Sequence, residues 1–226
     1  MPHPPPSIPT WDLPTRMFHW ILVLLVLDAL ISHTFGGIRM LWHFWNGYAI
    51  LTLLVFRFIW GFVGSSTARF GSFLAGWTAI RHYLGALRQG ETPHHLGHNP
   101  IGGWSVMAML ALLAVQGTSG LFATDEIVAS GPLHGLVDAD TADRLTTLHS
   151  LWFWLLVGMM ALHVGAVFFH LIIKKDNLIL PMLTGHKRPD QAPPDASARM
   201  QSPWLALPVL GVSILLVWFG IQVWRW

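Results

Sequence analysis

Two histidines on one apolar segment stand out as residues whose type and spacing could do chemistry. His149 and His163 lie within residues 148–174, a stretch longer than the roughly 20 residues that cross a bilayer as a helix. Fourteen residues separate them, so on a helix both rings leave one face about 21 Å apart along the axis. Imidazoles are poor lipid contacts and good ligands for haem iron, so this spacing predicts two irons at two depths. Histidines that only hydrogen-bond between helices are the alternative.

The composition indicates the environment of this segment. Hydrophobic residues make up 53% of the chain and charged residues 11%, about half the charged fraction of a soluble domain, which predicts an integral membrane protein. The absence of cysteine excludes covalent c-type haem, iron–sulfur clusters and disulfides, so a redox cofactor must be held by side chains such as the 13 histidines. A net charge of +2 gives no reason to expect a nucleic-acid partner. The proline-rich N-terminus does not have the pattern of a cleaved signal peptide.

Five apolar stretches are long enough to span a membrane, and helices are expected because no strand-like alternation occurs. They cover residues 17–35, 42–63, 102–123, 148–174 and 204–224. If the N-terminus is cytoplasmic, ten of the 13 Lys and Arg residues fall on the inner side, which predicts five spans with the C-terminus outside. Residues 73–88 have the helical spacing of an amphipathic helix in the inner headgroup region; a loop helix packed on the bundle is the alternative.

Each iron needs a second axial ligand at a matching depth. In this topology His163 lies near the inner face, and so does His19 at the start of the first span. His149 lies near the outer face, as does His43 at the start of the second span. His33 follows His19 by fourteen residues and reaches the outer level too, so periodicity does not choose between His33 and His43.

Several motifs occur in the order typical of one known family. They are WDLPTRMFHW (11–20), HFWNGY (43–48), FRFIWGFVGSSTARF (56–70), GHNPIGG (97–103) and LHSLWFWLLVGMMALHVGAV (148–167). Over residues 11–185 the sequence resembles the prokaryotic di-haem cytochrome b561 family, which is related to the cytochrome b subunit of nickel–iron hydrogenases. The resemblance implies two haem b groups, with an inner haem at His19 and His163 and an outer haem at His43 and His149.

The resemblance also implies a fold and a function. We expect an all-α integral membrane protein with a four-helix haem-binding transmembrane bundle and an additional C-terminal transmembrane helix. Residues 1–185 would form the core, 186–203 a polar linker and 204–226 the additional helix.

The implied function is electron transfer across the bacterial inner (cytoplasmic) membrane, as part of a respiratory chain. Electrons would pass between the quinone pool and a periplasmic c-type cytochrome or a dehydrogenase or hydrogenase subunit. The acidic outer loop, residues 124–146, is the expected docking surface for a basic cytochrome. A superoxide:quinone oxidoreductase acting alone is one alternative, and a haem-free, histidine-lined transporter is another.

Other side chains are candidates for supporting roles. Arg57 and Arg69 are expected to pair with haem propionates, because guanidinium binds carboxylate in a bidentate way; positive-inside charge is the alternative. Asp28, in the middle of the first span, is a candidate partner of a ligand imidazole or a proton relay, or a protonated acid facing a polar neighbour. His98 and His170 are candidates to hydrogen-bond a propionate or a quinone carbonyl.

Glycines in or beside the spans are expected to allow close approach of helices or of a porphyrin. They are Gly47, Gly61, Gly120, Gly158 and Gly165.

Overall fold

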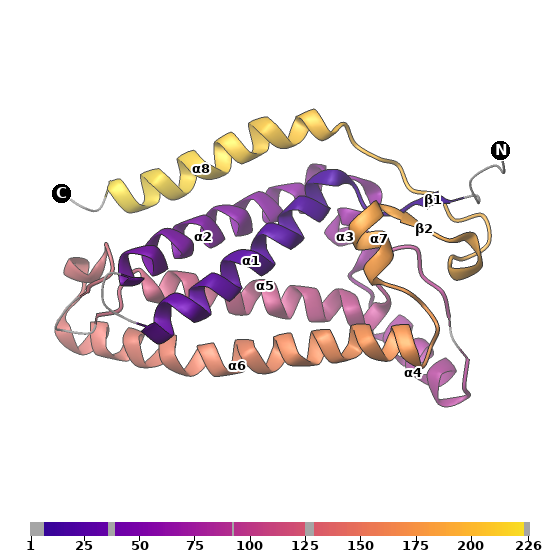
Figure 1. Cartoon of the computed structure of the whole chain (residues 1–226), viewed down its shortest axis with the longest axis horizontal. Coiled ribbons are helices and arrows are strands. Elements are labelled where there is room, and N and C mark those ends of the chain that lie inside the picture. Colours follow the sequence, from indigo (N-terminus) through magenta and orange to yellow (C-terminus); the bar gives the residue numbers. More distant parts are fainter. Residues whose placement is uncertain (1–6, 36–38, 92, 125–128, 224–226) are drawn as a thin grey trace. The chain divides into compact units, whose positions relative to one another are not determined.

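The computed structural model describes residues 7–35, 39–91, 93–124 and 129–223, without the side chains of residues 33–35 and 39. It is mostly helical, and five of the described helices are long and apolar enough to cross a membrane, as predicted. These candidate spans are Leu13–Ser32, Met40–Val63, Pro100–Gly120, Ala139–Ile172 and Pro203–Gln222. The helices that contain them are α1 (Leu13–Phe35), α2 (Arg39–Val63), α5 (Pro100–Gly120), α6 (Ala139–Ile172) and α8 (Ala206–Gln222) (Figure 1).

The helix α6 begins at Ala139, well before the apolar stretch that starts at residue 148. Asp138 caps this polar extension, because its carboxylate accepts hydrogen bonds of 2.9 Å from the backbone N–H and the hydroxyl of Thr141. These hydrogen bonds lower the pKa of Asp138 and favour its ionised form, which suits a helix N-terminus. The loop before the fourth span is therefore shorter than hydropathy predicts.

Short elements connect the long helices. They are β1 (Ile8–Pro9), η1 (Ser66–Ala68), α3 (Phe70–Phe73), α4 (Trp77–Arg88), η2 (His134–Leu136), α7 (Ile179–Thr184), β2 (His186–Lys187), η3 (Pro189–Gln191) and η4 (Pro203–Leu205). The amphipathic helix predicted over residues 73–88 is divided, because Leu74 and Gly76 are extended. Phe73 is buried at the end of α3, whereas Trp77 at the start of α4 is 70% exposed.

The chain packs as two compact units. The first unit contains Met1–Met17, Ile59–Ala108 and Ala161–Ala206. The second unit contains Phe18–Phe58, Met109–Met160 and Leu207–Trp226. The helices α1, α2, α5 and α6 therefore each contribute one part of their length to each unit, whereas α8 lies in the second unit from Leu207 on.

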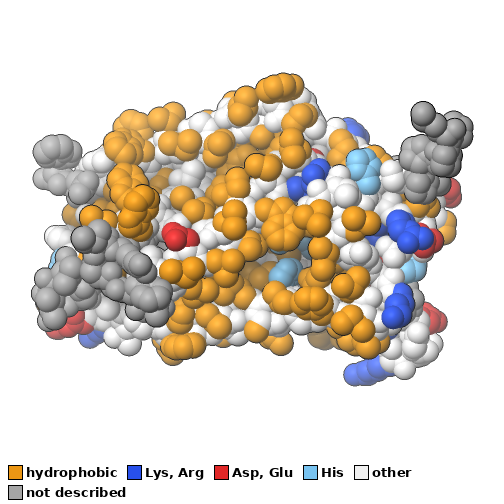
Figure 2. All heavy atoms as spheres, in the orientation of Figure 1, with side chains coloured by type: hydrophobic (Ala, Val, Ile, Leu, Met, Phe, Trp, Pro, Cys, Tyr) orange, Lys and Arg blue, Asp and Glu red, His pale blue; other side chains and the backbone are white. Residues whose placement is uncertain are grey.

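The second unit has an apolar core. Val26 of α1, Ile50 of α2, Leu112 and Leu113 of α5 and Leu156 of α6 are buried together. Because lipid is as apolar as these side chains, close van der Waals packing, rather than exclusion of water, holds such a core together. The outward faces of the same helices are apolar as well, and Figure 2 shows hydrophobic side chains over much of the visible surface.

The first unit is held by buried polar contacts at the ends of the helices. Asp12 accepts hydrogen bonds from the backbone N–H of Thr15 (2.7 Å), from the indole of Trp60 (3.1 Å) and from the backbone N–H of Ser65 (3.3 Å). Asp12 is 6% exposed and Trp60 is fully buried. One carboxylate therefore caps α1 and fixes the end of α2.

Within the first unit, the segment after α6 is joined to the segment before α1 by backbone pairing. Ile8 pairs with Lys187 and Pro9 with His186 in an antiparallel ladder. Further along, Arg199 and Ser66 exchange hydrogen bonds, and the Ser65 hydroxyl accepts one from the backbone N–H of Gln201. The polar segment 186–203 is itself part of the first unit and is thus held within it near both of its ends.

Candidate functional site

The second unit brings together the two histidines predicted for the outer level. His43 lies near the start of α2 and His149 lies on α6, and their ring centroids are 6.2 Å apart with the ring planes at 88°. Imidazole nitrogen binds a metal ion at about 2 Å, and the ring centre lies roughly 1 Å further on, so two rings that held one ion between them would have centroids about 6 Å apart. The separation therefore fits a single iron between the rings. The competing candidate, His33, lies in α1, and its side chain is outside the described residues.

The His43 ring is oriented by the backbone of α1. Its Nδ1 lies 3.3 Å from the carbonyl oxygen of Ala29 and 3.4 Å from the hydroxyl of Ser32. Ser32 is buried and donates its own hydrogen bond to the same Ala29 carbonyl at 3.2 Å. Because a carbonyl can only accept, the Nδ1–H tautomer is fixed here and a metal would be bound through Nε2.

The His149 ring is oriented in the same way by α5. Its Nδ1 lies 2.9 Å from the carbonyl oxygen of Gln116 and 3.3 Å from the hydroxyl of Ser119. Ser119 is buried and donates to the Gln116 carbonyl at 3.1 Å. The Gln116 side-chain amide lies 3.2 Å from Nε2 of His149, so this amide must turn aside if Nε2 binds a metal.

Two glycines shape the space around these rings. A Cβ atom on Gly120 would lie 2.8 Å from Cε1 of His149 and 3.2 Å from its Nδ1, so only glycine lets the imidazole rest against α5. Gly47 is one turn after His43, and a Cβ there would have no neighbour within 4 Å. Open space beside His43 suits the edge of a porphyrin. Together with the imidazole geometry, it means that the residues present fit a haem group.

The two histidines predicted for the inner level belong to different units. His19 is half-buried in the second unit, next to the ring of Trp20 at 4.9 Å between centroids. His163 is half-buried in the first unit. The structure therefore gives no separation for this pair.

The two arginines differ in their surroundings. Arg57 follows His43 by fourteen residues, so it lies on the same face of α2, and it is only 3% exposed. Arg69 lies in the first unit just before α3, and its Nε donates to the Gly64 carbonyl at 2.8 Å. Asp28 accepts a hydrogen bond from Asn46 of α2, so among the described residues its hydrogen-bond partner is an amide and not an imidazole.

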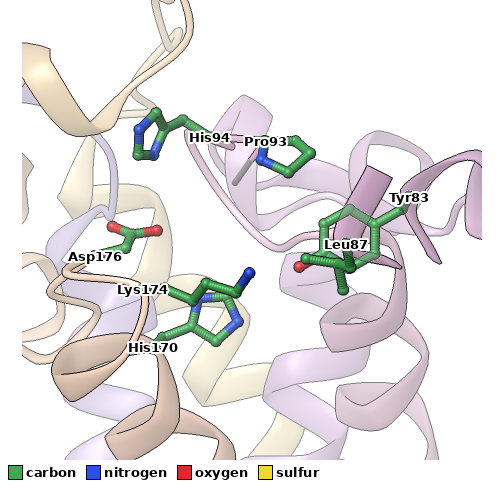
Figure 3. Close-up of a pocket in the computed structure, with 7 residues that line it drawn as sticks. All are labelled: Tyr83, Leu87, Pro93, His94, His170, Lys174 and Asp176. Carbon is green, nitrogen blue, oxygen red and sulfur yellow. The ribbon is translucent and has the colours of Figure 1, made fainter. Parts of the chain in front are cut away.

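The first unit contains a small, partly open pocket near the end of α6 (Figure 3). It is lined by Tyr83, Leu87, Pro93, His94, His170, Lys174 and Asp176. The buried Nδ1 of His170 has no hydrogen-bond partner among the described residues. Figure 3 shows His170, from the last turn of α6, and Lys174, which follows the helix, across the pocket from Tyr83 and Leu87 of α4. The pocket therefore combines a polar wall with an apolar one.

Asp176, which lines this pocket, is part of a buried ion pair. Nζ of Lys187 is 3.0 Å from Oδ1 of Asp176 and donates to the His95 carbonyl at 3.0 Å. Burial raises the pKa of Tyr83, and the charge of Asp176 adds to this effect. Burial also lowers the pKa of His95. Sequence reasoning missed Tyr83, Asp176 and Lys187, because they are far apart in the chain and match no motif.

The remaining histidine candidates do not gather. His98 packs between aromatic rings, with centroids 4.8 Å from both Trp11 and Phe73. Among the described residues, no three His, Cys, Asp or Glu side chains are grouped as a metal site. Of the acidic outer loop, Asp125 and Glu126 lie outside the described residues.

Comparison with known proteins gives a consistent family. The model of prokaryotic cytochrome b561 matches residues 10–185. A probable Ni/Fe-hydrogenase B-type cytochrome subunit of Azotobacter chroococcum mcd 1 is 25% identical, over 81% of this chain and 92% of its own length. A protein of the same description from Rhizobium leguminosarum bv. viciae is 23% identical, over 80% of this chain and 89% of its own length. Another from Rhodobacter capsulatus is 22% identical, over 80% of this chain and 81% of its own length. No solved structure shows a significant match. Because the family model covers most of the chain, this protein belongs to the prokaryotic cytochrome b561 family.

Proposed function

We propose that this chain is a di-haem b-type cytochrome that carries electrons between the membrane quinone pool and a catalytic redox subunit. The observation that supports it most is the pair His43 and His149, two neighbouring imidazoles that could hold one metal ion between them, each with Nδ1 near a helix carbonyl. Haem iron supplies one-electron exchange when bound. The chain binds the group, orients it and excludes water from it.

The proposed ligands are His43 and His149 for the outer haem and His19 and His163 for the inner haem. Arg57 is proposed to pair with a propionate, since a guanidinium on the His43 face of α2 presents a fork that matches a carboxylate. Arg69 is proposed for the same role. Its Nε donates to the Gly64 carbonyl, so its other guanidinium N–H groups would bind the propionate. Residues 1–185 would form the cytochrome core, 186–203 the linker and 204–226 an additional helix.

The partner is proposed from the relatives. Their descriptions as B-type cytochrome subunits of Ni/Fe hydrogenases favour a hydrogenase or dehydrogenase catalytic subunit, with a periplasmic c-type cytochrome as the other possible partner. The basic residues favour a bacterial inner-membrane protein with a cytoplasmic N-terminus.

We place the quinone head group at the pocket of the first unit. Quinone chemistry couples electrons to protons, so it needs groups that donate and accept hydrogen bonds beside an apolar surface. His170 offers a buried Nδ1, Lys174 a cation and Leu87 an apolar wall. The pocket is small, so a quinone ring would enter only part of the way and leave its tail in the lipid.

Haem quantitation tests the proposal. The purified wild type should carry two haems per chain and show the reduced-minus-oxidised spectrum of a b-type cytochrome. His43→Ala and His149→Ala should each retain one haem, and His33→Ala should retain two. A colourless protein, or one haem in the wild type, contradicts the proposal; loss of a haem in His33→Ala but not in His43→Ala moves the outer ligand to His33.

Reduction by a quinol tests the pocket separately. In proteoliposomes, His170→Ala should slow haem reduction by a short-chain quinol at least tenfold with both haems retained. His82, which is exposed on α4 outside the pocket, provides the control variant His82→Ala. Equal rates in the two variants would exclude this pocket.

A further inference from the structure

The two outer imidazoles rest on the same arrangement, built twice on different helices. In each case one helix carbonyl lies near the histidine Nδ1, and a serine three residues later donates its hydroxyl to that carbonyl. On α1 the pair is Ala29 and Ser32, and the hydroxyl–carbonyl distance is 3.2 Å. On α5 the pair is Gln116 and Ser119, and the distance is 3.1 Å.

A serine bonded to its own helix is not unusual by itself. Ser213 of α8 is fully buried and donates to the Val209 carbonyl at 2.8 Å, with no histidine in the arrangement. What distinguishes Ser32 and Ser119 is that the carbonyl they share also faces an imidazole Nδ1. Their hydroxyl oxygens are themselves 3.4 Å and 3.3 Å from that nitrogen.

We propose that Ser32 and Ser119 are positioning residues that set the reduction potential of the outer haem through the hydrogen bonds of its two ligands. This inference rests on the proposed function, in which His43 and His149 bind that haem. The serines touch neither iron nor porphyrin in the proposal; they act on the carbonyl and the ring nitrogen behind each ligand.

The direction follows from the shared carbonyl. A carbonyl that already accepts a hydroxyl proton is a weaker acceptor for the imidazole N–H. Removing the hydroxyl strengthens the N–H···O=C bond and makes the imidazole a more basic ligand. A more basic ligand favours the ferric over the ferrous state, so the potential of that haem falls.

The effect should be confined to one haem. Among the described residues, the Ser32 hydroxyl contacts only the Ala29 carbonyl and His43, and the Ser119 hydroxyl only the Gln116 carbonyl and His149, so neither serine is joined to an inner candidate. The proposal therefore predicts a change in the difference between the two potentials, which a general loss of stability would not produce.

Redox titration of the purified holoprotein tests this inference. In Ser32→Ala and Ser119→Ala the midpoint potential of the outer haem should fall, and that of the inner haem should stay unchanged. The double variant should fall furthest, and Ser32→Thr and Ser119→Thr, which keep the hydroxyl, should restore the wild-type value. Ser213→Ala is the matched control and should leave both potentials unchanged.

The outcomes separate the two proposals. If wild type and variants carry two haems but the alanine variants show no shift, a rise, or equal shifts of both haems, the serine inference is wrong and the cytochrome proposal stands. If the wild type lacks two haems, the cytochrome proposal fails first. If an alanine variant does not bind the outer haem, cysteine, with its weaker S–H donor, takes its place: the potential must fall with cysteine and return with threonine.

Discussion

The two units of this chain use polar side chains for different purposes. In the first unit, buried polar groups hold connecting segments together, as in the Asp12–Trp60 contact and the Lys187–Asp176 ion pair. In the second unit, the core is apolar, and buried serines and helix carbonyls surround His43 and His149.

The difference follows from the solvent at each place. Segments that connect the spans do not form long helices, so many of their backbone and side-chain polar groups have no hydrogen-bond partner within the segment. Where these groups are buried away from water, they need partners elsewhere in the protein. Helices within lipid already satisfy their backbone groups, so a buried polar side chain there is not needed for the fold. We therefore expect that replacing buried polar residues changes the free energy of unfolding in the first unit. In the second unit, we expect it to change the binding or the spectrum of the proposed haem.

The largest expected effect is in the first unit. Lys187→Met removes one partner of a buried ion pair, with side chains 2% and 11% exposed, and should lower the free energy of unfolding by about 3–5 kcal/mol. Denaturant titration in detergent measures it. The neighbouring Arg188→Met breaks an exposed pair with Asp190 and should cost about 0–1 kcal/mol. Equal costs would show that burial of the Lys187 pair is unimportant.

A somewhat smaller decrease in the free energy of unfolding is expected for Asp12→Ala. It removes three hydrogen bonds and leaves the indole N–H of the fully buried Trp60 without this acceptor, which should cost about 2–4 kcal/mol. The haem spectrum of the folded protein should not change. If Asp12→Ala changed the haem spectrum but not the free energy of unfolding, the proposed difference between the two units would be wrong.

In the second unit, Gly120→Ala should act on the site. The new Cβ would lie 2.8 Å from the His149 ring, so the imidazole must shift, at a cost of about 1–3 kcal/mol. The expected signature is a changed low-spin haem spectrum or loss of the outer haem. Gly211→Ala in α8, where a Cβ meets nothing within 4 Å, is the control and should leave the spectrum unaltered.

The smallest effect is a pH dependence in the first unit. Burial holds the pKa of His95 below its ordinary value, and unfolding restores it. Below about pH 6.5 the unfolded chain thus binds more protons than the folded one, and stability present above this pH is lost as the pH falls. His95→Gln should reduce the fall in melting temperature between about pH 7.5 and pH 5.5 by a few degrees. An unchanged pH dependence would assign the effect to other groups.

Hydropathy was enough to predict the five spans, because lipid demands long apolar helices. It did not predict the polar start of α6, since that turn depends on the Asp138 cap and not on hydrophobicity. Depth along the spans allowed His43 or His33 to be paired with His149, and the structure brings the rings of His43 and His149 together. The serines behind them were missed, because a serine within a span carries no signal until its helix neighbours are known.

The pairing of β1 with β2 has a consequence for synthesis of the protein. Ile8 and Pro9 leave the ribosome before all five candidate spans, but their partners His186 and Lys187 emerge only after four of those spans. The N-terminal segment must therefore wait, unpaired, while most of the polypeptide is inserted. A nascent chain arrested before residue 186 would leave this end of the protein open, and we expect quality-control proteases to recognise it there.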